Sequence, residues 1–139
     1  MYLLDTCVLS ELVKANPESA VLAWMAERKE HELFVSAMTI AELYRGIAKL
    51  PTSPRKSDLT VWLQQVEAGF DERVMSFTLD TAHVWAQMCA NAEAAGKSMA
   101  AFDSIIVATA VEHSLCLVTR NIRDFSNVSV ELLNPWPAR

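Results

Sequence analysis

Short apolar runs alternate with longer amphipathic patterns along this chain. The apolar runs predict strands at 2–4, 33–36, 74–77, 115–118 and, at a sheet edge, 128–133. The amphipathic patterns predict helices at 18–29, 39–50, 57–68, 80–95 and 101–113, with a further helix directly after Asp5. Such alternation is typical of an α/β fold, here a three-layer sandwich with a mainly parallel central sheet flanked by helices. We expect the 139 residues to form a single domain, 1–139, with one mobile loop at 51–57.

Five acidic residues stand where predicted strands end or predicted helices begin. They are Asp5, Glu42, Asp80, Asp103 and Asp124. In a parallel α/β layer, the carboxyl ends of strands and the amino ends of helices share one edge of the sheet, and ligands bind there. We therefore expect all five carboxylates on the same edge.

Asp5 and Asp103 are the acids that local structure explains least well. Asp5 ends an apolar strand, where a carboxylate competes poorly with the usual residues, although it also suits the cap of the following helix. Asp103 precedes Ile106, Val107 and Ala110 on one helical face, so its carboxylate is expected to point along a buried stripe. A carboxylate in that setting needs a cation or strong hydrogen-bond donors.

The other three acids have ordinary structural explanations as well. Glu42 fits a capping box with Thr39 and lies outside the apolar stripe of its helix. Asp80 has the position of a helix N-cap. Asp124 and Asn121 suit a turn. These explanations stay open beside a role in a site.

Composition and charge limit the classes of function that this chain can have. A net charge of −5 argues against a protein that holds nucleic acid through a general basic field. Carboxylates that hold divalent cations also lower the formal charge, so an acidic chain is compatible with a metal-dependent enzyme acting on phosphates. No apolar stretch approaches the roughly 18 residues of a membrane span, and the three cysteines lack zinc-site spacing. We expect a cytoplasmic protein whose 52% hydrophobic content favours an apolar interface.

Four motifs carry a family resemblance that runs nearly end to end. They are LLDT at 3–6, TIAEL at 39–43, FDSIIVATA at 102–110 and VTRNIRDF at 118–125. In this order the chain resembles the PIN-domain ribonucleases, and most closely the VapC-type toxins of bacterial toxin–antitoxin pairs, including the FitB-like branch. Each motif is short, but the four together in register are specific.

The resemblance implies an acidic site that hydrolyses RNA phosphodiester bonds with Mg²⁺ or Mn²⁺. The metal ligands would be Asp5, Glu42 and Asp103, with Asp124 as a fourth catalytic acid. Thr6, Thr119 and Asn121 would support them, and either Asn121 or Asp124 would supply the fourth position.

Cations near the expected rim are candidates for holding RNA. They are Arg45, Lys49, Arg120 and Arg123, with Arg55 and Lys56 close in sequence. The resemblance also implies a cognate VapB-like antitoxin, a homodimer and a larger toxin–antitoxin assembly, with no membrane partner.

Three alternatives and one departure from the family pattern accompany this interpretation. The chain is alternatively a catalytically silent PIN module that binds an antitoxin or RNA, or a metal-dependent DNA nuclease. An aspartyl phosphotransferase is disfavoured because Cys7 occupies the place of its second acid. Many PIN members have Asn where Cys7 stands, so we also consider a thiol that responds to oxidation or soft metals.

Overall fold

The computed structural model describes residues 1–138. Its elements, in chain order, are β1 (Tyr2–Leu4), α1 (Thr6–Leu12), α2 (Ser19–Ala26), η1 (Glu30–Glu32), β2 (Leu33–Ser36), α3 (Ala37–Ala48), α4 (Pro54–Phe70), η2 (Asp71–Arg73), β3 (Val74–Met75), α5 (Leu79–Ala94), α6 (Ala101–Glu112), β4 (Cys116–Val118), η3 (Ile122–Phe125) and β5 (Leu132–Leu133).

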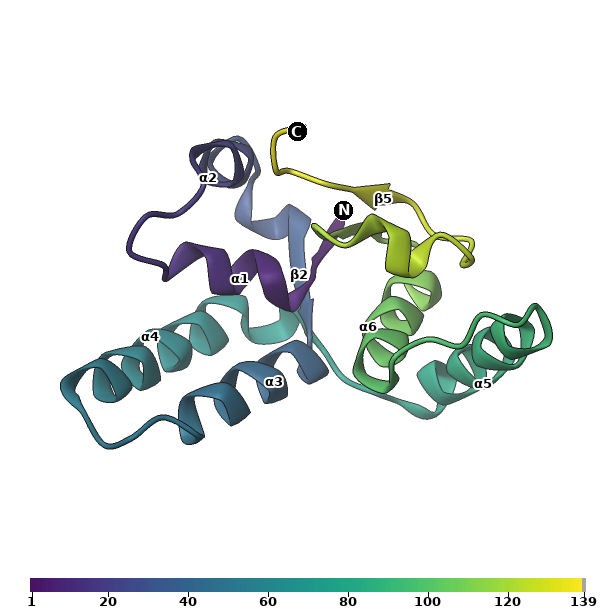
Figure 1. Ribbon diagram of the computed structural model, residues 1–139, viewed down its shortest axis with the longest axis horizontal. Coiled ribbons are helices and arrows are strands. Elements are labelled where there is room, and N and C mark those ends of the chain that lie inside the picture. Colours follow the sequence, from purple (N-terminus) through teal and green to yellow (C-terminus); the bar gives the residue numbers. More distant parts are fainter. Residues whose placement is uncertain (139) are drawn as a thin grey trace.

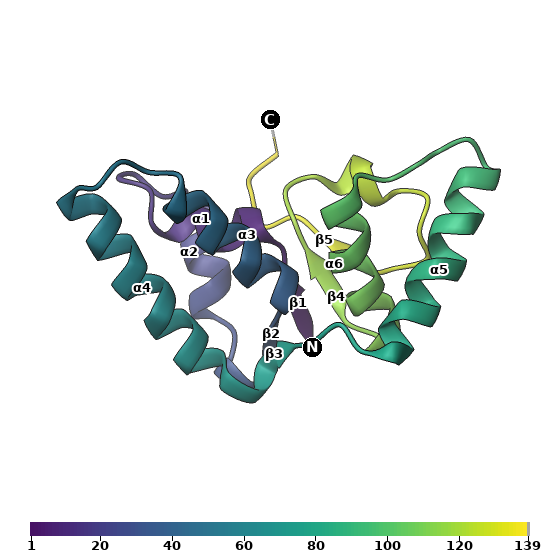
Figure 2. The ribbon, with the colours of Figure 1, turned by 90° about the horizontal axis from the view of Figure 1, so that it is seen from below.

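The strands of residues 1–138 form one sheet in the order β3-β2-β1-β4-β5, and every neighbouring pair is parallel. Figure 2 shows α1 to α4 on one side of this sheet and α5 and α6 on the other. The α/β sandwich with a parallel sheet predicted from the sequence is confirmed.

Side chains alternate between the two faces of each strand, so the sheet contributes to two separate cores. Leu4, Val35 and Val118 face the core under α1 to α4. Leu3 and Leu117 face the core under α6, against which α5 packs from outside. The central strands β1 and β4 are buried on both faces, which explains why their sequences are continuous apolar runs.

Three sequence predictions about boundaries are wrong. The segment 51–57 is not wholly a loop, because α4 begins at Pro54 with Ser53 as its N-cap. Proline at the first helical position lacks the amide hydrogen that a helix would leave unpaired there. The strands predicted at 74–77 and 128–133 are limited to Val74–Met75 and Leu132–Leu133.

The carboxyl ends of β1 and β4 lie together, and this positions the site. The amide of Asp5 donates to the carbonyl of Val118 at 2.9 Å, so the ladder between the strands continues to the last residue before α1. The amide of Thr119 donates to the carbonyl of Leu133 at 2.9 Å on the other side. Figure 1 shows α1 starting directly where the first strand ends.

No helix within residues 1–138 is both long and apolar enough to cross a lipid bilayer.

Candidate active site

Asp5 is a buried carboxylate whose two oxygens are both held in place. Its side chain is only 5% exposed. Oδ1 accepts a hydrogen bond from the amide of Thr6 at 2.8 Å, and Oδ2 accepts one from the Thr119 hydroxyl at 2.8 Å. Asp5 is therefore the N-cap of α1, as one interpretation of the sequence allowed, and it also has a fixed orientation toward the edge of the sheet.

Thr119 connects Asp5 to the segment that follows β4. Its hydroxyl, which donates to Asp5, also accepts the amide of Asn121 at 3.1 Å. Thr119 is fully buried, whereas the Asn121 side chain is exposed beside it. This bond ties the start of η3, which carries Asp124, to the carboxylate at the end of β1.

Glu42 is linked to the same region through Thr6. The predicted capping box of Thr39 and Glu42 is wrong, because Ser36 is the N-cap of α3 and accepts the amide of Thr39. Glu42 therefore lies in the second turn of α3, not the first. Its Oε1 accepts the Thr6 hydroxyl at 2.8 Å, a contact across 36 residues of sequence that local patterns do not reveal.

Asp103 lies in the first turn of α6, and the charges of other acids affect its pKa. Burial raises the pKa of its carboxyl group, and the negative charges of Asp5, Glu42 and Asp124 raise that pKa further. The half-buried side chain thus lies within the electrostatic reach of acids from three other elements. A cation is the natural way to relieve this repulsion.

Of the two remaining acids predicted at this edge, Asp124 lies near the others and Asp80 does not. Asp124 is exposed in η3, but its charge reaches Asp103, and its neighbour Phe125 is fully buried and anchors the turn. Asp80 does not join the group, contrary to the prediction. The Thr81 hydroxyl donates to Glu112 at 2.6 Å, which places the start of α5 beside the last turn of α6, at the opposite end from Asp103.

Asp80 is also not a helix cap. Thr78 is the N-cap of α5, and its hydroxyl accepts the amide of Thr81. Asp80 is an exposed acid in the first turn, where it interacts favourably with the positive end of the helix dipole.

The chemistry of the donors suits a hard divalent cation. Carboxylate oxygens are the ligands preferred by Mg²⁺ and Mn²⁺, and Mg²⁺ usually retains several waters and needs only one or two protein carboxylates. In the described part of the chain, no three Asp, Glu, His or Cys side chains are gathered closely enough to enclose an ion. The fit thus rests on the donor type and on the nearby acids Asp5, Glu42 and Asp124, whose charges, after burial, raise the pKa of Asp103.

The candidate RNA-binding cations occupy different settings. The guanidinium of Arg45 lies 6.0 Å from the centre of the Phe102 ring, and that of Arg120 lies 5.5 Å from the Trp136 ring. Lys56 donates from Nζ to the carbonyls of Ala48 and Leu50, so it closes the turn between α3 and α4. The remaining candidates are exposed: Lys49, Arg55 and Arg123.

Cys7 lies against the site, and the pKa of its thiol is raised. Its Sγ is 3.8 Å from Oδ2 of Asp5 and 3.8 Å from the Thr119 hydroxyl. Burial raises the pKa of this thiol, and the charge of Asp5 raises it further. The reactive thiolate is thereby disfavoured at neutral pH, which argues against a role as an oxidation sensor.

An apolar groove opens directly beside the acids. It has a volume of about 340 Å³ and runs between α1, α3 and α4. Its lining residues are Thr6, Ser10, Val13, Glu42, Leu43, Gly46, Ile47, Leu50, Leu59 and Trp62. Because Glu42 belongs to both the groove and the acidic group, a segment bound in the groove reaches the site.

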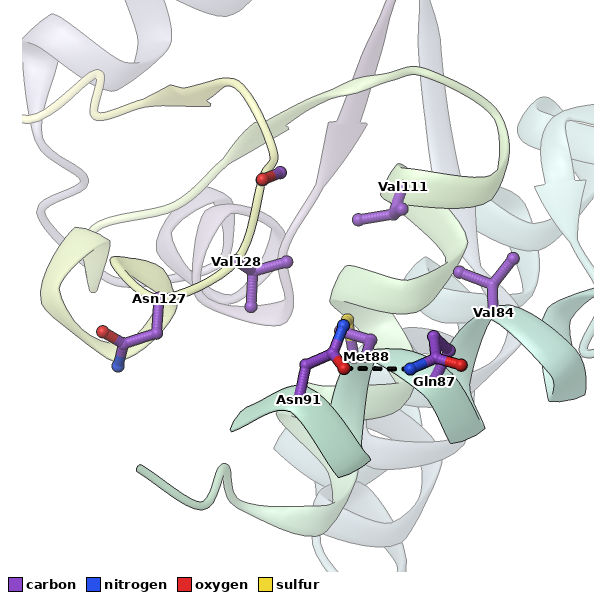
Figure 3. A pocket seen from close by; sticks show the side chains of 8 residues that line it. Val84, Gln87, Met88, Asn91, Val111, Asn127 and Val128 are labelled. Atoms are coloured by element: carbon purple, nitrogen blue, oxygen red, sulfur yellow. Dashed lines mark hydrogen bonds between the residues drawn. The ribbon is translucent and has the colours of Figure 1, made fainter. Parts of the chain in front are cut away.

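A second cavity, of about 380 Å³, lies between α5, α6 and the segment 127–129 (Figure 3). Gln87 and Asn91 line it and share a hydrogen bond of 2.9 Å. Val84, Met88 and Val111 make up much of the remaining wall. This lining carries no ionisable side chain, so the cavity offers no general acid, base or metal ligand.

Comparisons with known proteins point to one family. The PIN domain family model matches residues 2–131. The chain is 38% identical over 137 residues to VapC ribonuclease Y4jK of Sinorhizobium fredii, covering 98% of both chains. It is 37% identical to toxin FitB of Neisseria gonorrhoeae, covering 98% of this chain and 99% of that one.

Solved structures of similar proteins support the same family. The structure of FitAB bound to an IR36 DNA fragment matches with a TM-score of 0.94 and 34% identity, over 100% of this chain and 98% of that one. The crystal structure of FitAcB from Neisseria gonorrhoeae matches with a TM-score of 0.94 and 37% identity, over 99% of this chain and 100% of that one.

Proposed function

This chain belongs to the PIN-domain family, and from that premise we propose that it is the toxin of a toxin–antitoxin pair and acts as a metal-dependent endoribonuclease. The observation that carries the proposal is the hydrogen-bond network at the carboxyl end of β1, in which Thr119 holds Asp5 and Thr6 holds Glu42. The pKa of Asp103, raised by burial and by the charges of Asp5, Glu42 and Asp124, supports it. Its relatives include a protein named as a VapC ribonuclease and one named as toxin FitB.

We assign the metal-holding role to Asp5, Glu42 and Asp103, with Mg²⁺ as the preferred ion. A bound divalent cation would supply Lewis acidity for hydrolysis of a phosphodiester. Thr6 and Thr119 hold both oxygens of Asp5 in one orientation, which lowers the reorganisation that cation binding requires. Asp124 and Asn121, on the segment tied to Thr119, are assigned the positioning of water at the exposed side.

Cleavage of total cellular RNA by purified, partner-free protein tests this function. We expect discrete RNA fragments with Mg²⁺ or Mn²⁺ and none with EDTA. Asp5→Asn should lower cleavage about a thousandfold, because it removes a charged ligand worth several kcal/mol of transition-state stabilisation. Asp80→Asn is the matched control, since Asp80 is exposed and lies at the other end of α6.

Three results would redirect the assignment. Cleavage that survives both EDTA and Asp5→Asn would contradict a carboxylate-bound metal site. Equal cleavage of a DNA strand of matching sequence would indicate a nuclease without RNA preference. Binding of RNA or antitoxin by folded protein that cuts nothing would support a silent PIN module.

We propose that the partner is a cognate antitoxin that occupies the apolar groove between α1, α3 and α4. Relatives of the chain have been solved as complexes described as FitAB and FitAcB. The groove is apolar, as a docking site for an amphipathic segment should be, and its end at Glu42 gives a basic side chain of that segment access to the acids.

Gly46→Gln tests the groove without removing any packing. Gly46 lines the groove, and a Cβ added there meets no atom within 4 Å, so a side chain can begin there without a clash. We expect the rest of the glutamine to occupy part of the groove. We expect at least tenfold weaker capture of the co-expressed antitoxin. Gly69→Gln is the control, because Gly69 lies in α4, is equally open and is outside the groove. Equal capture by both variants would place the antitoxin elsewhere.

We also propose that the chain works in the cytoplasm as one domain, 1–139, and forms a homodimer. Exposed apolar side chains such as Leu22, Val61 and Leu79 supply surface for association. A mass by light scattering of twice 15.5 kDa for the partner-free protein is expected, and a mass equal to one chain would contradict the dimer.

A further inference from the structure

An exposed aromatic ring stands directly beside the acidic site. Phe102 is 42% exposed and immediately precedes Asp103 in the first turn of α6. Among the described residues, Phe102 is not one of those that form or pack against the core beneath α6. Its position next to Asp103 places it at the end of α6 that carries this acid.

A cation from another element lies over the same ring. The guanidinium of Arg45 is 6.0 Å from the centre of the Phe102 ring, within the range of a cation–π contact. Arg45 lies on α3, one turn after Glu42, so the pair joins α3 to α6 beside the acids. Among residues 1–138 Arg45 forms no ion pair, which leaves its charge available to a phosphate.

The overall negative charge of the chain favours a contact with RNA that does not depend on charge alone. Affinity for nucleic acid usually comes from cations that neutralise phosphates and release counterions. This chain has a net charge of −5, and its site is itself acidic. Base stacking on an aromatic ring does not depend on net charge, and it accepts any base because every base has a π-face.

Building on the proposed ribonuclease function, we propose that Phe102 and Arg45 form a nucleotide-binding pair beside the acids. The Phe102 ring stacks on the base of a single-stranded nucleotide next to the scissile phosphate. The Arg45 guanidinium contacts a backbone phosphate of that nucleotide. Both are substrate-binding residues, and the stack selects unpaired RNA because a base in a duplex does not present its face.

Binding of two short fluorescent RNAs tests the pair in EDTA, where no cleavage occurs. One is a single-stranded adenosine oligomer, and the other is its abasic counterpart with the same phosphates. For Phe102→Ala we expect about tenfold weaker binding of the adenosine oligomer and unchanged binding of the abasic one. Phe102→Trp should retain the affinity, and Phe102→Leu, which keeps apolar volume but loses the ring, should not.

Arg45→Ala should behave differently, because it removes a charge contact. We expect weaker binding of both oligomers by the same factor, with the slope of log affinity against log salt reduced by about 0.7. Phe77→Ala is the matched control, since Phe77 is 48% exposed but lies beside the start of α5, near the far end of α6. It should leave both affinities unchanged.

The outcomes separate this inference from the ribonuclease function. If wild-type protein cleaves RNA while Phe102→Ala binds the adenosine oligomer normally, the function stands and the stacking pair is wrong. If Phe102→Ala instead changes the mass by light scattering, Phe102 belongs to an interface between chains, and the inference is overturned. If the adenosine oligomer loses affinity in Phe102→Ala although the protein cuts no RNA, the pair stands and the ribonuclease assignment fails.

Discussion

Asp103→Asn is expected to lower RNA cleavage about a thousandfold or more while making the metal-free protein more stable. The loss of activity follows from removing a charged oxygen ligand of the proposed cation. The gain in stability follows from the repulsion at this residue, because asparagine fills the same space without the charge. We expect a rise in Tm of a few degrees in EDTA at neutral pH.

The pH dependence of that gain has a definite sign. The folded protein raises the pKa of Asp103, so ionisation of this carboxyl group favours the unfolded chain. The stability of the wild type is therefore higher when Asp103 is protonated, and it falls as pH rises through the folded-state pKa. The difference in Tm between variant and wild type should vanish below about pH 4, the pKa of an unfolded aspartate.

Thermal unfolding with EDTA and with Mg²⁺ checks this prediction. Mg²⁺ should raise the Tm of the wild type and have much less effect on Asp103→Asn. Asp80→Asn serves as the control, since it removes an exposed acid from the first turn of α5 and should change neither activity nor the Mg²⁺ response. A variant that melts lower than the wild type in EDTA would show that Asp103 makes stabilising bonds instead.

Phe125→Ala is expected to cause the largest loss of stability. Phe125 is fully buried in the core beneath α6, together with Leu3, Ile106 and Leu117. Truncating a buried phenylalanine removes its transfer free energy and leaves a cavity, at a cost of about 3–5 kcal/mol. For a domain of this size the Tm should fall by roughly 10–20 °C.

The same change should affect the site before the whole protein unfolds. Phe125 anchors η3, whose first turn carries Asp124, so the segment that holds this acid loses its support. We expect weaker Mg²⁺ binding at temperatures where the fold persists, measured by titration calorimetry. Phe77→Ala, which removes an exposed ring of the same size, should lower the free energy of unfolding by less than about 0.5 kcal/mol. Similar losses for the two variants would contradict the anchoring role.

The sequence predicted the parallel sheet because its signals are local. Each strand is an apolar run next to turn residues, and a parallel arrangement then places strand ends on one edge. Asp5 and Asp103 were predicted as site residues for the same reason. Asp5 ends an apolar strand, and Asp103 lies on the apolar face of a helix. The roles of these acids remain proposals, but their positions at the ends of β1 and at the start of α6 follow from the pattern.

Contacts between residues that are distant in the sequence could not be predicted from it. The rule that a helix begins at the carboxyl edge of the sheet failed for Asp80, because α5 packs on α6 and starts beside the last turn of that helix. The capping pattern of Thr39 was misleading because α3 begins earlier, with Ser36 as its N-cap. Glu42 instead bonds Thr6, 36 positions away in sequence, which no local pattern reveals. The contact of Arg45 with Phe102 likewise depends on how α3 meets α6.

The two cores described above share one sheet, and the proposed site needs both. Asp5 and Glu42 are supported by the core under α1 to α4, whereas Asp103 is supported by the core under α6. A chain still emerging from the ribosome contains the first pair long before it contains the second half of the sheet. With the proposed ligands divided between the two cores, we expect cleavage of RNA, including the message that encodes the protein, to begin only after both halves of the sheet have formed.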